Sequence, residues 1–264
     1  MTTLPVTPAF NEKTGVATLT FNRPEVLNAI DVPMAQAFHH AVKDLAGKPG
    51  LRCVVLTGAG RAFMAGGDVA SMSGSPVQTR EAVNGMLDAL IPAILKLRAM
   101  DAPVIAGVKG AAAGAGLSLA LMADLIVAEE SARFLIAYNG IGTVPDCGGT
   151  WFLPHKIGSA RATEMMMLGR TLTAIEAKQW GLVTEVSPQG EFDKTLAAVV
   201  HRVANGPTKA FGAFRRLVDD ASGSPLEAHL EAERQAFLKA TESADFAEGV
   251  SAFLAKRPAA FSGK

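Results

Sequence analysis

The sequence predicts an α/β fold followed by a helical C-terminal region. Short apolar segments at residues 53–57, 103–108 and 125–129 have the length of buried strands, and the first two run into glycine-rich turns. Segments with apolar residues at helical spacing lie between them, and toward the C-terminus only helical patterns remain. We therefore expect an α/β core over residues 1–190 and a helical region over residues 191–264.

The N-terminal part begins with a strand and a helix. Residues 16–21 mix Val, Thr and Phe and are followed by Pro24, which predicts a strand that ends there. Residues 31–45 carry apolar side chains at helical spacing, and Asp31 can cap this helix. Residues 53–57 are almost entirely apolar, which predicts a strand in a sheet that is covered on both faces.

The same alternation continues along the chain. A stripe of Met, Leu and Ile predicts a helix over residues 80–100, before the strand at 103–108. The turn at 110–116 leads into a predicted helix at 117–124 and the strand at 125–129. The remaining predicted helices span residues 160–168, 173–180 (with Thr173 as its cap), 192–205, 225–240 and 243–254.

The composition excludes several kinds of partner. The 264 residues include 25 Lys or Arg and 25 Asp or Glu, so the net charge of zero gives no reason to expect a nucleic acid or a membrane surface as partner. Cys53 and Cys147 form no CxxC motif, which indicates a reducing compartment. No signal peptide or membrane span is visible, and the adjacent His39 and His40 point apart on a helix. We expect a cytoplasmic protein without a metal site.

Two loops rich in glycine and alanine are the strongest functional signal. Residues 60–69 and 110–116 each follow an apolar strand, and the second opens a helix. Small residues let a ligand approach the backbone, and a helix N-terminus leaves N–H donors free. Two such donors aimed at one point would stabilise an oxyanion. The alternative is close packing of helix on strand, which also favours Gly and Ala.

The motifs around these loops resemble the crotonase (enoyl-CoA hydratase/isomerase) superfamily from about residue 16 to the C-terminus. They are Arg23-Pro24-x-x-Leu27-Asn28-Ala29, Phe63-x-Ala65-Gly66-Gly67-Asp68, and Gly110-x-Ala112-x-Gly114-Ala115-Gly116 followed by Ala123-Asp124. The resemblance implies a spiral of β-β-α turns, with C-terminal helices that form a homotrimer or a dimer of trimers. It also implies an acyl-CoA thioester as ligand, with its carbonyl bound by the N–H groups of Gly67 and Ala115.

The resemblance also assigns a site for coenzyme A, which would enter as part of the substrate; no permanently bound cofactor is expected. Asp68 is expected to order its own loop by accepting backbone N–H bonds, and Asp124 to hold a turn or a core hydrogen bond. The residues expected to line the coenzyme A site are Arg23, Val26, Leu27, Ala29, Ala65, Gly66, Asp68, Val69, Phe253 and Lys256.

The acid and base of the family hydratases are missing here. The positions that match their two glutamates are Ser118 and Tyr138, and a hydroxyl is too weak a base near neutral pH. Asp146 lies in a glycine-rich segment that resembles the epoxyphenylacetyl-CoA isomerase of phenylacetate degradation and its relatives, where an Asp at this position moves a proton. Otherwise Asp146 is a turn former after Pro145. Ser118, Tyr138 and Trp151 are expected to line the acyl pocket, although Trp151 also fits a core position.

Several functions stay open at this point. An acyl-CoA double-bond isomerase needs one carboxylate, and Asp146 can supply it. A hydratase would need a differently held water, and a non-catalytic acyl-CoA-binding protein or a thioester hydrolase would keep the same motifs. The segment Gly116-x-Ser118 is an incomplete nucleophile elbow, and residues 114–119 lack the third glycine of a dinucleotide loop.

Overall fold

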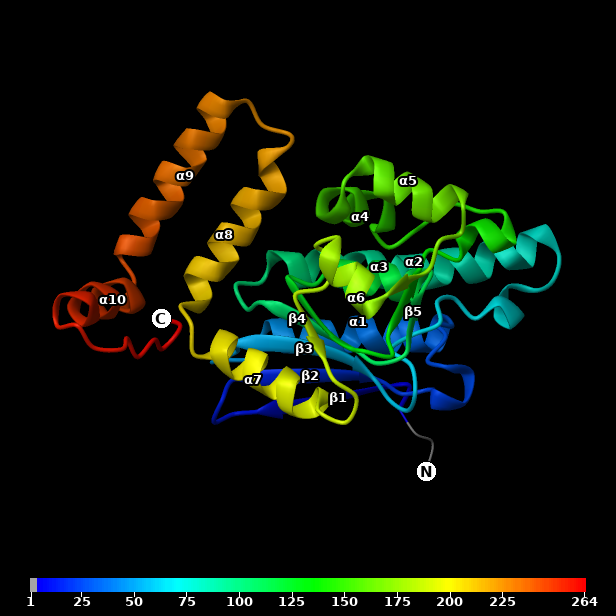
Figure 1. The fold of residues 1–264 in the computed structure, drawn as a ribbon, viewed down its shortest axis with the longest axis horizontal. Helices are drawn as coiled ribbons and strands as arrows, with labels where there is room; N and C mark the ends of the chain where they lie inside the picture. Colours follow the sequence, from blue (N-terminus) through cyan, green and yellow to red (C-terminus); the bar gives the residue numbers. More distant parts are fainter. Residues whose placement is uncertain (1–3) are drawn as a thin grey trace.

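The computed structural model describes residues 4–264 and contains two β-sheets (Figure 1). In the larger sheet the first two strands are antiparallel and all other neighbours are parallel. Its strands in spatial order are β1 (Val6–Asn11), β2 (Val16–Phe21), β3 (Cys53–Gly58), β4 (Val104–Val108), β6 (Leu125–Glu129) and β9 (Glu185–Ser187). The smaller sheet contains β5 (Ala111–Ala113), β7 (Arg133–Leu135) and β8 (Leu172–Thr173).

The chain passes repeatedly from the larger sheet to the smaller one. β4 leads into β5, and β6 leads into β7. Isolated parallel bridges, Ile30 with Gly67 and Met64 with Ala112, continue this arrangement for the earlier turns. Each turn therefore adds one strand to the larger sheet and one extended segment beside the smaller sheet. The expected α/β spiral is present, and both glycine-rich loops lie where the chain crosses between the sheets.

Two helices begin at the side-chain caps that the sequence predicts, Asp31 and Thr173. Asp31 accepts from the N–H of Met34 at 2.9 Å, and Thr173 forms a capping box with Glu176. The helix predicted at 80–100 starts earlier because Ser75 also forms a capping box.

The helices of the core are α1 (Val32–Ala46), α2 (Pro76–Ala99), α3 (Ala115–Leu121), α4 (Gly149–Ile157), α5 (Ser159–Met167) and α6 (Ala174–Gln179), with 3₁₀ turns η1 (Pro24–Val26), η2 (Val69–Met72) and η3 (Tyr138–Ile141).

Both faces of the larger sheet are covered, as the apolar strand at 53–57 predicts. Val54 and Leu56 of β3 point into the main core, which α1 and α2 share. Cys53 and Val55 point the other way and pack against α7 (Phe192–Ala204), whose Phe192 is buried there. Burial raises the pKa of the Cys53 thiol to about 12, which fits a core residue rather than a reactive one.

Some elements have no counterpart in the sequence prediction. The strands β7, β8 and β9 have only two or three residues, too few to show a periodicity. The helix α4 begins at Gly149 and contains Pro154, both of which favour a turn. The helix α8 (Thr208–Ala221) begins after Gly206-Pro207 without a side-chain cap.

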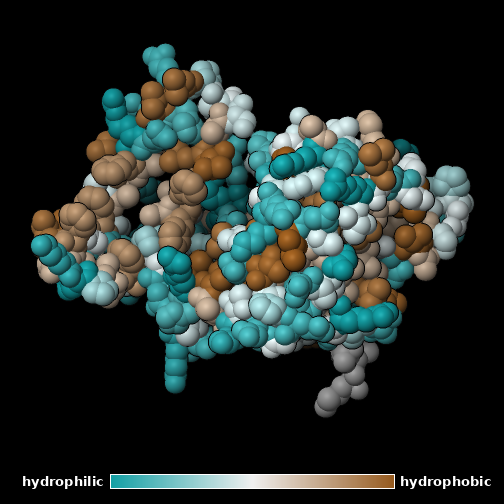
Figure 2. Space-filling model, viewed as in Figure 1, coloured by the Kyte–Doolittle hydropathy of each residue, from teal (hydrophilic) through white to brown (hydrophobic). Residues whose placement is uncertain are grey.

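The C-terminal helices form an arm that extends away from the sheets (Figure 1). After α7 and α8 the arm contains α9 (Leu226–Thr241) and α10 (Ala244–Leu254). α9 buries none of its residues, and Figure 2 shows brown, apolar residues along the arm. A domain limit near residue 190 stays a prediction. Among residues 4–264, no helix is long and apolar enough to cross a bilayer. The large exposed apolar side chains of α8–α10 are Phe211, Phe214, Val218, Leu226, Leu230, Phe237, Leu238, Phe246, Val250, Phe253 and Leu254.

Candidate functional site

A turn ahead of α1 is built around Asn28, whose side chain is fully buried at 0% exposure. Asn28 has a φ angle of 58°, and its Oδ1 accepts from the N–H of Arg23 at 2.9 Å. Its Nδ2 donates, at 3.0, 2.9 and 3.2 Å, to the carbonyls of Ala59, Ala62 and Phe63. One amide group therefore joins this turn to the first glycine-rich loop.

Replacing Asn28 with alanine should lower the free energy of unfolding by about 3 kcal/mol, because buried polar groups lose their partners. Urea unfolding of the purified protein measures this. The matched control is Asn205→Ala, since the Asn205 Nδ2 bonds the carbonyl of His201 at an exposed site and its loss should cost less than about 1 kcal/mol. Equal losses in the two variants would contradict the assigned role of Asn28.

The two glycine-rich loops lie directly against each other. The N–H of Met64 donates to the carbonyl of Ala111 at 2.9 Å, and the N–H of Ala113 donates back to Met64 at 2.9 Å. Gly66 has a φ angle of 103°, and a Cβ on it would lie 3.0 Å from the Ala113 carbonyl oxygen and 3.5 Å from the Ala115 nitrogen. Glycine at this position therefore permits the close approach.

The N–H groups of Gly67 and Ala115 are free at this junction. The carbonyl of Gly66 accepts from Ile30 at 2.7 Å, and Asp68 donates to Ile30 at 2.8 Å, so the N–H between them points the other way. Ala115 is the first residue of α3, where an N–H has no partner in its own helix. Within residues 4–264, neither N–H has a recorded acceptor. Two donors without a backbone acceptor thus stand on adjoining loops, and their use in binding an oxyanion stays a prediction.

Asp68 does not act as we expected from the sequence. Its side chain makes no cap bond to the backbone of η2; instead its Oδ2 pairs with Arg23 Nη2 at 3.2 Å. Arg23 Nη1 also donates to the Ala29 carbonyl at 2.6 Å and pairs with Asp31 at 3.0 Å. The expectation of backbone donors on Asp68 was wrong because a nearby guanidinium takes its carboxylate.

Most of the residues predicted to bind coenzyme A gather around this ion pair. The N–H of Ala65 donates to the carbonyl of Leu27 at 3.0 Å, next to Ala29 and Gly66. Val26 in η1 and Val69 at the start of η2 are exposed. Ala29 and Gly66 are buried beneath them, and the role of these residues in binding stays a prediction.

Tyr138 and Asp146 meet beside the second loop. The Tyr138 hydroxyl donates to Asp146 Oδ1 at 2.5 Å. A Cβ on Gly114 would lie 3.9 Å from Cε2 of Tyr138, so the ring borders the N-terminus of α3. Burial, followed by the neighbouring Asp146 carboxylate, raises the pKa of Tyr138, which keeps the phenol protonated as a donor. The Asp146 carboxylate is therefore held by a side chain, not by its own turn.

Ser118 lies at the same junction. It is buried in α3, its Oγ lies 3.5 Å from the carbonyl of Gly114, and a Cβ on Gly149 would lie 2.5 Å from that Oγ. In the described part of the chain, no histidine bonds Ser118. The arrangement therefore lacks the base that a serine nucleophile requires.

Trp151 lies apart from this junction. Its indole is 41% exposed, stacks on His155 with ring centroids 4.3 Å apart, and lines an open cavity of about 400 Å³ between α4 and α8. None of the other residues predicted for the site lines that cavity. The structure thus brings Ser118, Tyr138 and Asp146 together without Trp151.

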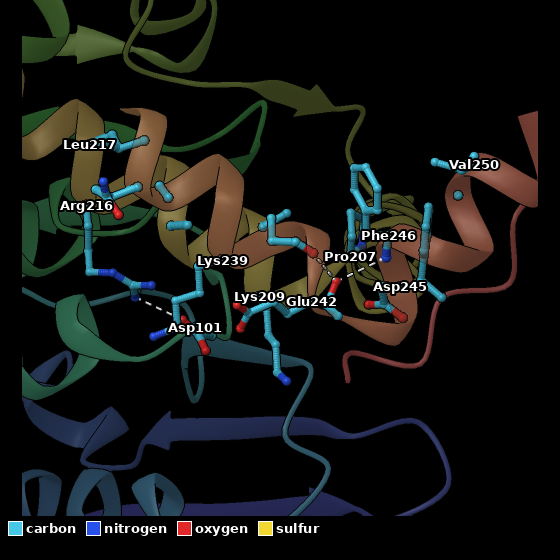
Figure 3. A pocket seen from close by; sticks show the side chains of 18 of the residues that line it. Asp101, Pro207, Lys209, Arg216, Leu217, Lys239, Glu242, Asp245, Phe246 and Val250 are labelled. Carbon is cyan, nitrogen blue, oxygen red and sulfur yellow. Dashed lines mark hydrogen bonds and ion pairs between the residues drawn. The ribbon is translucent and has the colours of Figure 1, made fainter. Parts of the chain in front are cut away.

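Phe253 and Lys256 also lie far from the loops. Both are near the end of α10, at the opposite end of the molecule from β5 (Figure 1), and Phe253 is 84% exposed. Phe253 lines a cavity of about 1050 Å³ between the arm helices, which Figure 3 shows with the 2.9 Å ion pair of Arg216 and Asp101. This cavity therefore lies in the arm and not at the two loops.

Sequence reasoning missed the contact between Cys147 and Asp146. Cys147, next to Asp146, is buried. Its burial, and to a smaller extent the charge of Asp146, raises the pKa of its thiol.

Asp124 joins separate helices: Arg98 and Arg215 pair with it at 2.9 and 2.8 Å, and the N–H of Val104 donates to it at 2.8 Å. Its predicted structural role is confirmed. The described residues contain no cluster of metal ligands.

The chain is similar to known proteins over almost its whole length. A family model described as "Enoyl-CoA hydratase/isomerase" matches residues 11–264. The "1,2-epoxyphenylacetyl-CoA isomerase" of Escherichia coli (strain K12) is 38% identical over 251 residues, which are 95% of this chain and 96% of that protein. A "Probable enoyl-CoA hydratase" of Rhodobacter capsulatus is 39% identical over 250 residues, 95% of each chain. The crystal structure of enoyl-CoA hydratase from Mycobacterium smegmatis has a TM-score of 0.89 at 32% identity and covers 97% of this chain and 98% of that one.

Proposed function

The chain belongs to the enoyl-CoA hydratase/isomerase family and has the crotonase fold, and on that basis we propose that it is an acyl-CoA double-bond isomerase. One observation carries the proposal. Asp146 is the carboxylate bonded to Tyr138 beside the second loop, whereas the positions that match the two hydratase glutamates hold Ser118 and Tyr138. The name of the relative from Escherichia coli, an isomerase, supports the same assignment.

The proposed reaction moves one proton and needs no cofactor. The thioester carbonyl oxygen accepts from the N–H groups of Gly67 and Ala115. The Asp146 carboxylate removes a proton from the carbon between the carbonyl and the double bond, and the electron pair moves onto the carbonyl oxygen. The two donors stabilise this dienolate. Asp146 then returns the proton to the far carbon of the former double bond, which places the double bond next to the carbonyl.

Hydration is the second candidate, and a relative of equal similarity carries a hydratase name. It would require a placed water in addition to the base. Ser118 and Tyr138 offer hydroxyl groups for this, but neither can act as a carboxylate base. A non-catalytic acyl-CoA-binding protein is a third candidate, and it keeps the two donors without turnover.

Incubation with a panel of unsaturated acyl-CoA esters separates these candidates. We expect a product of unchanged mass with an altered ultraviolet spectrum, and no ¹⁸O from labelled water in the acyl group. A product heavier by one water would support the hydratase, and release of free thiol would support a thioester hydrolase. Tight binding of the esters by calorimetry, with no turnover of any of them, would support the non-catalytic protein.

The arm supports a further part of the proposal, assembly as a homotrimer or a dimer of trimers. α8–α10 expose eleven large apolar side chains, and an exposed apolar surface is typical of a protein–protein interface. Phe253 and Lys256 would then contact coenzyme A across an interface, because on their own chain they lie away from the loops. Light scattering coupled to gel filtration tests the assembly. A cytoplasmic location and the absence of a permanently bound cofactor stay predictions.

A further inference from the structure

Tyr138 occupies a position that the proposed isomerase mechanism does not use. It stands where a hydratase of the family has a glutamate, yet it is buried and its hydroxyl reaches a single acceptor, Oδ1 of Asp146, at 2.5 Å. Its ring also borders Gly114, directly before the free N–H of Ala115. One side chain therefore contacts both the carboxylate and the loop that carries an oxyanion donor.

We propose that Tyr138 is a positioning residue that selects the reactive oxygen of Asp146. The inference rests on the proposed isomerase function. A hydrogen bond donated to Oδ1 fixes the rotation of the carboxylate and lowers the basicity of that oxygen, which leaves Oδ2 to exchange the proton with substrate.

The surroundings of Asp146 permit this role. Among the described residues, two titratable groups interact with Asp146: the Tyr138 phenol and the Cys147 thiol. No basic side chain in this part of the chain pairs with it. Burial raises the pKa of both groups, so both remain protonated across the working pH range. Both side chains bond Asp146, and the hydroxyl of Tyr138 does so at 2.5 Å, which makes the phenol the group that orients the carboxylate.

The chain offers a precise test because Tyr138 is its one tyrosine. Tyr138→Phe removes the donor and keeps the ring. Growth on difluorotyrosine places a more acidic phenol, and thus a stronger donor, at this position alone. We expect Tyr138→Phe to lower kcat about tenfold and to move the acidic limb of kcat/KM upward, because the reacting carboxylate loses a hydrogen-bond donor. The difluorotyrosine protein should move the same limb downward.

A purely structural role would not give shifts of opposite sign. If both proteins keep the wild-type acidic limb while they isomerise substrate, the inference is wrong and Tyr138 is only a pocket wall. Denaturant unfolding checks that each protein is folded. Should Tyr138→Phe fail to fold, the difluorotyrosine protein still decides, because it keeps the shape of the native side chain.

A second readout does not depend on activity. In an alkaline titration the absorbance of tyrosinate reports Tyr138 alone. Asp146→Asn removes the neighbouring charge, so Tyr138 should ionise at lower pH in this variant than in the wild type. An unchanged titration would contradict the contact itself. If the wild type isomerises no acyl-CoA ester but the titration shifts, the proposed function fails while the Tyr138–Asp146 pair stands.

Discussion

Asp146→Asn is expected to reduce the kcat of isomerisation by about 10²–10⁴-fold, the usual contribution of a positioned general base. Asparagine has nearly the same shape and still accepts the Tyr138 hydrogen bond, but it cannot take a proton from substrate. KM should change little, because the thioester contacts lie on the two loops. Steady-state kinetics with a β,γ-unsaturated acyl-CoA ester measures both constants.

Asp193→Asn is the matched control for this prediction. Asp193 is exposed in the first turn of α7, where it pairs with Lys109 at 3.1 Å. Its kcat should equal that of the wild type, because an exposed ion pair contributes little and the Asp193 side chain has no part in the proposed proton transfer. Full activity of Asp146→Asn would show that another group moves the proton, and the role assigned to Asp146 would have to be abandoned.

Ala115→Pro is expected to lower kcat by about 10²–10³-fold, the usual cost of losing one oxyanion donor. Proline removes the N–H at this position and puts a ring carbon in the place of the hydrogen, so no donor remains for the carbonyl oxygen. Ala115 is the first residue of α3, where proline is tolerated because the N–H has no helical partner. The loss should therefore fall on catalysis, with the free energy of unfolding nearly unchanged in a urea titration.

Ala115→Gly keeps the N–H and serves as control. The Ala115 side chain is buried, so the glycine variant should lose some stability, by about 1 kcal/mol. Its kcat should stay close to that of the wild type. If proline and glycine at this position gave the same kcat, the N–H of Ala115 would not be a donor to the reacting oxygen.

The sequence predicts the parts of the fold where pattern and chemistry coincide. Residues 53–57 are apolar on both faces, and the sheet is covered on both sides. The sequence predicts Asp31 and Thr173 as helix caps, and both accept the expected N–H bonds. The strand β7 could not be predicted, because three residues show no period and it pairs with segments far along the chain.

The candidate site likewise has a part that the sequence predicts and a part that it does not. Small residues at Gly66 and Gly114 indicate a close approach of backbones, which the geometry at Ala115 bears out. The bond between Tyr138 and Asp146 has no such signal, because it depends on the turn of η3 and the left-handed backbone of Ala137, whose φ angle is 62°. The partner of Asp68 could not be predicted either, since its pairing with Arg23 joins residues that are 45 positions apart in the chain.

Hydrogen exchange between substrate and heavy water tests the central claim most directly, because it reports the dienolate itself. In D₂O, wild-type protein should exchange the protons between the carbonyl and the double bond of a β,γ-unsaturated acyl-CoA ester while it moves the double bond. Asp146→Asn and Ala115→Pro should each lose exchange and isomerisation in parallel. Exchange that persists at the wild-type rate in both variants would contradict a dienolate formed by Asp146 and held by Ala115.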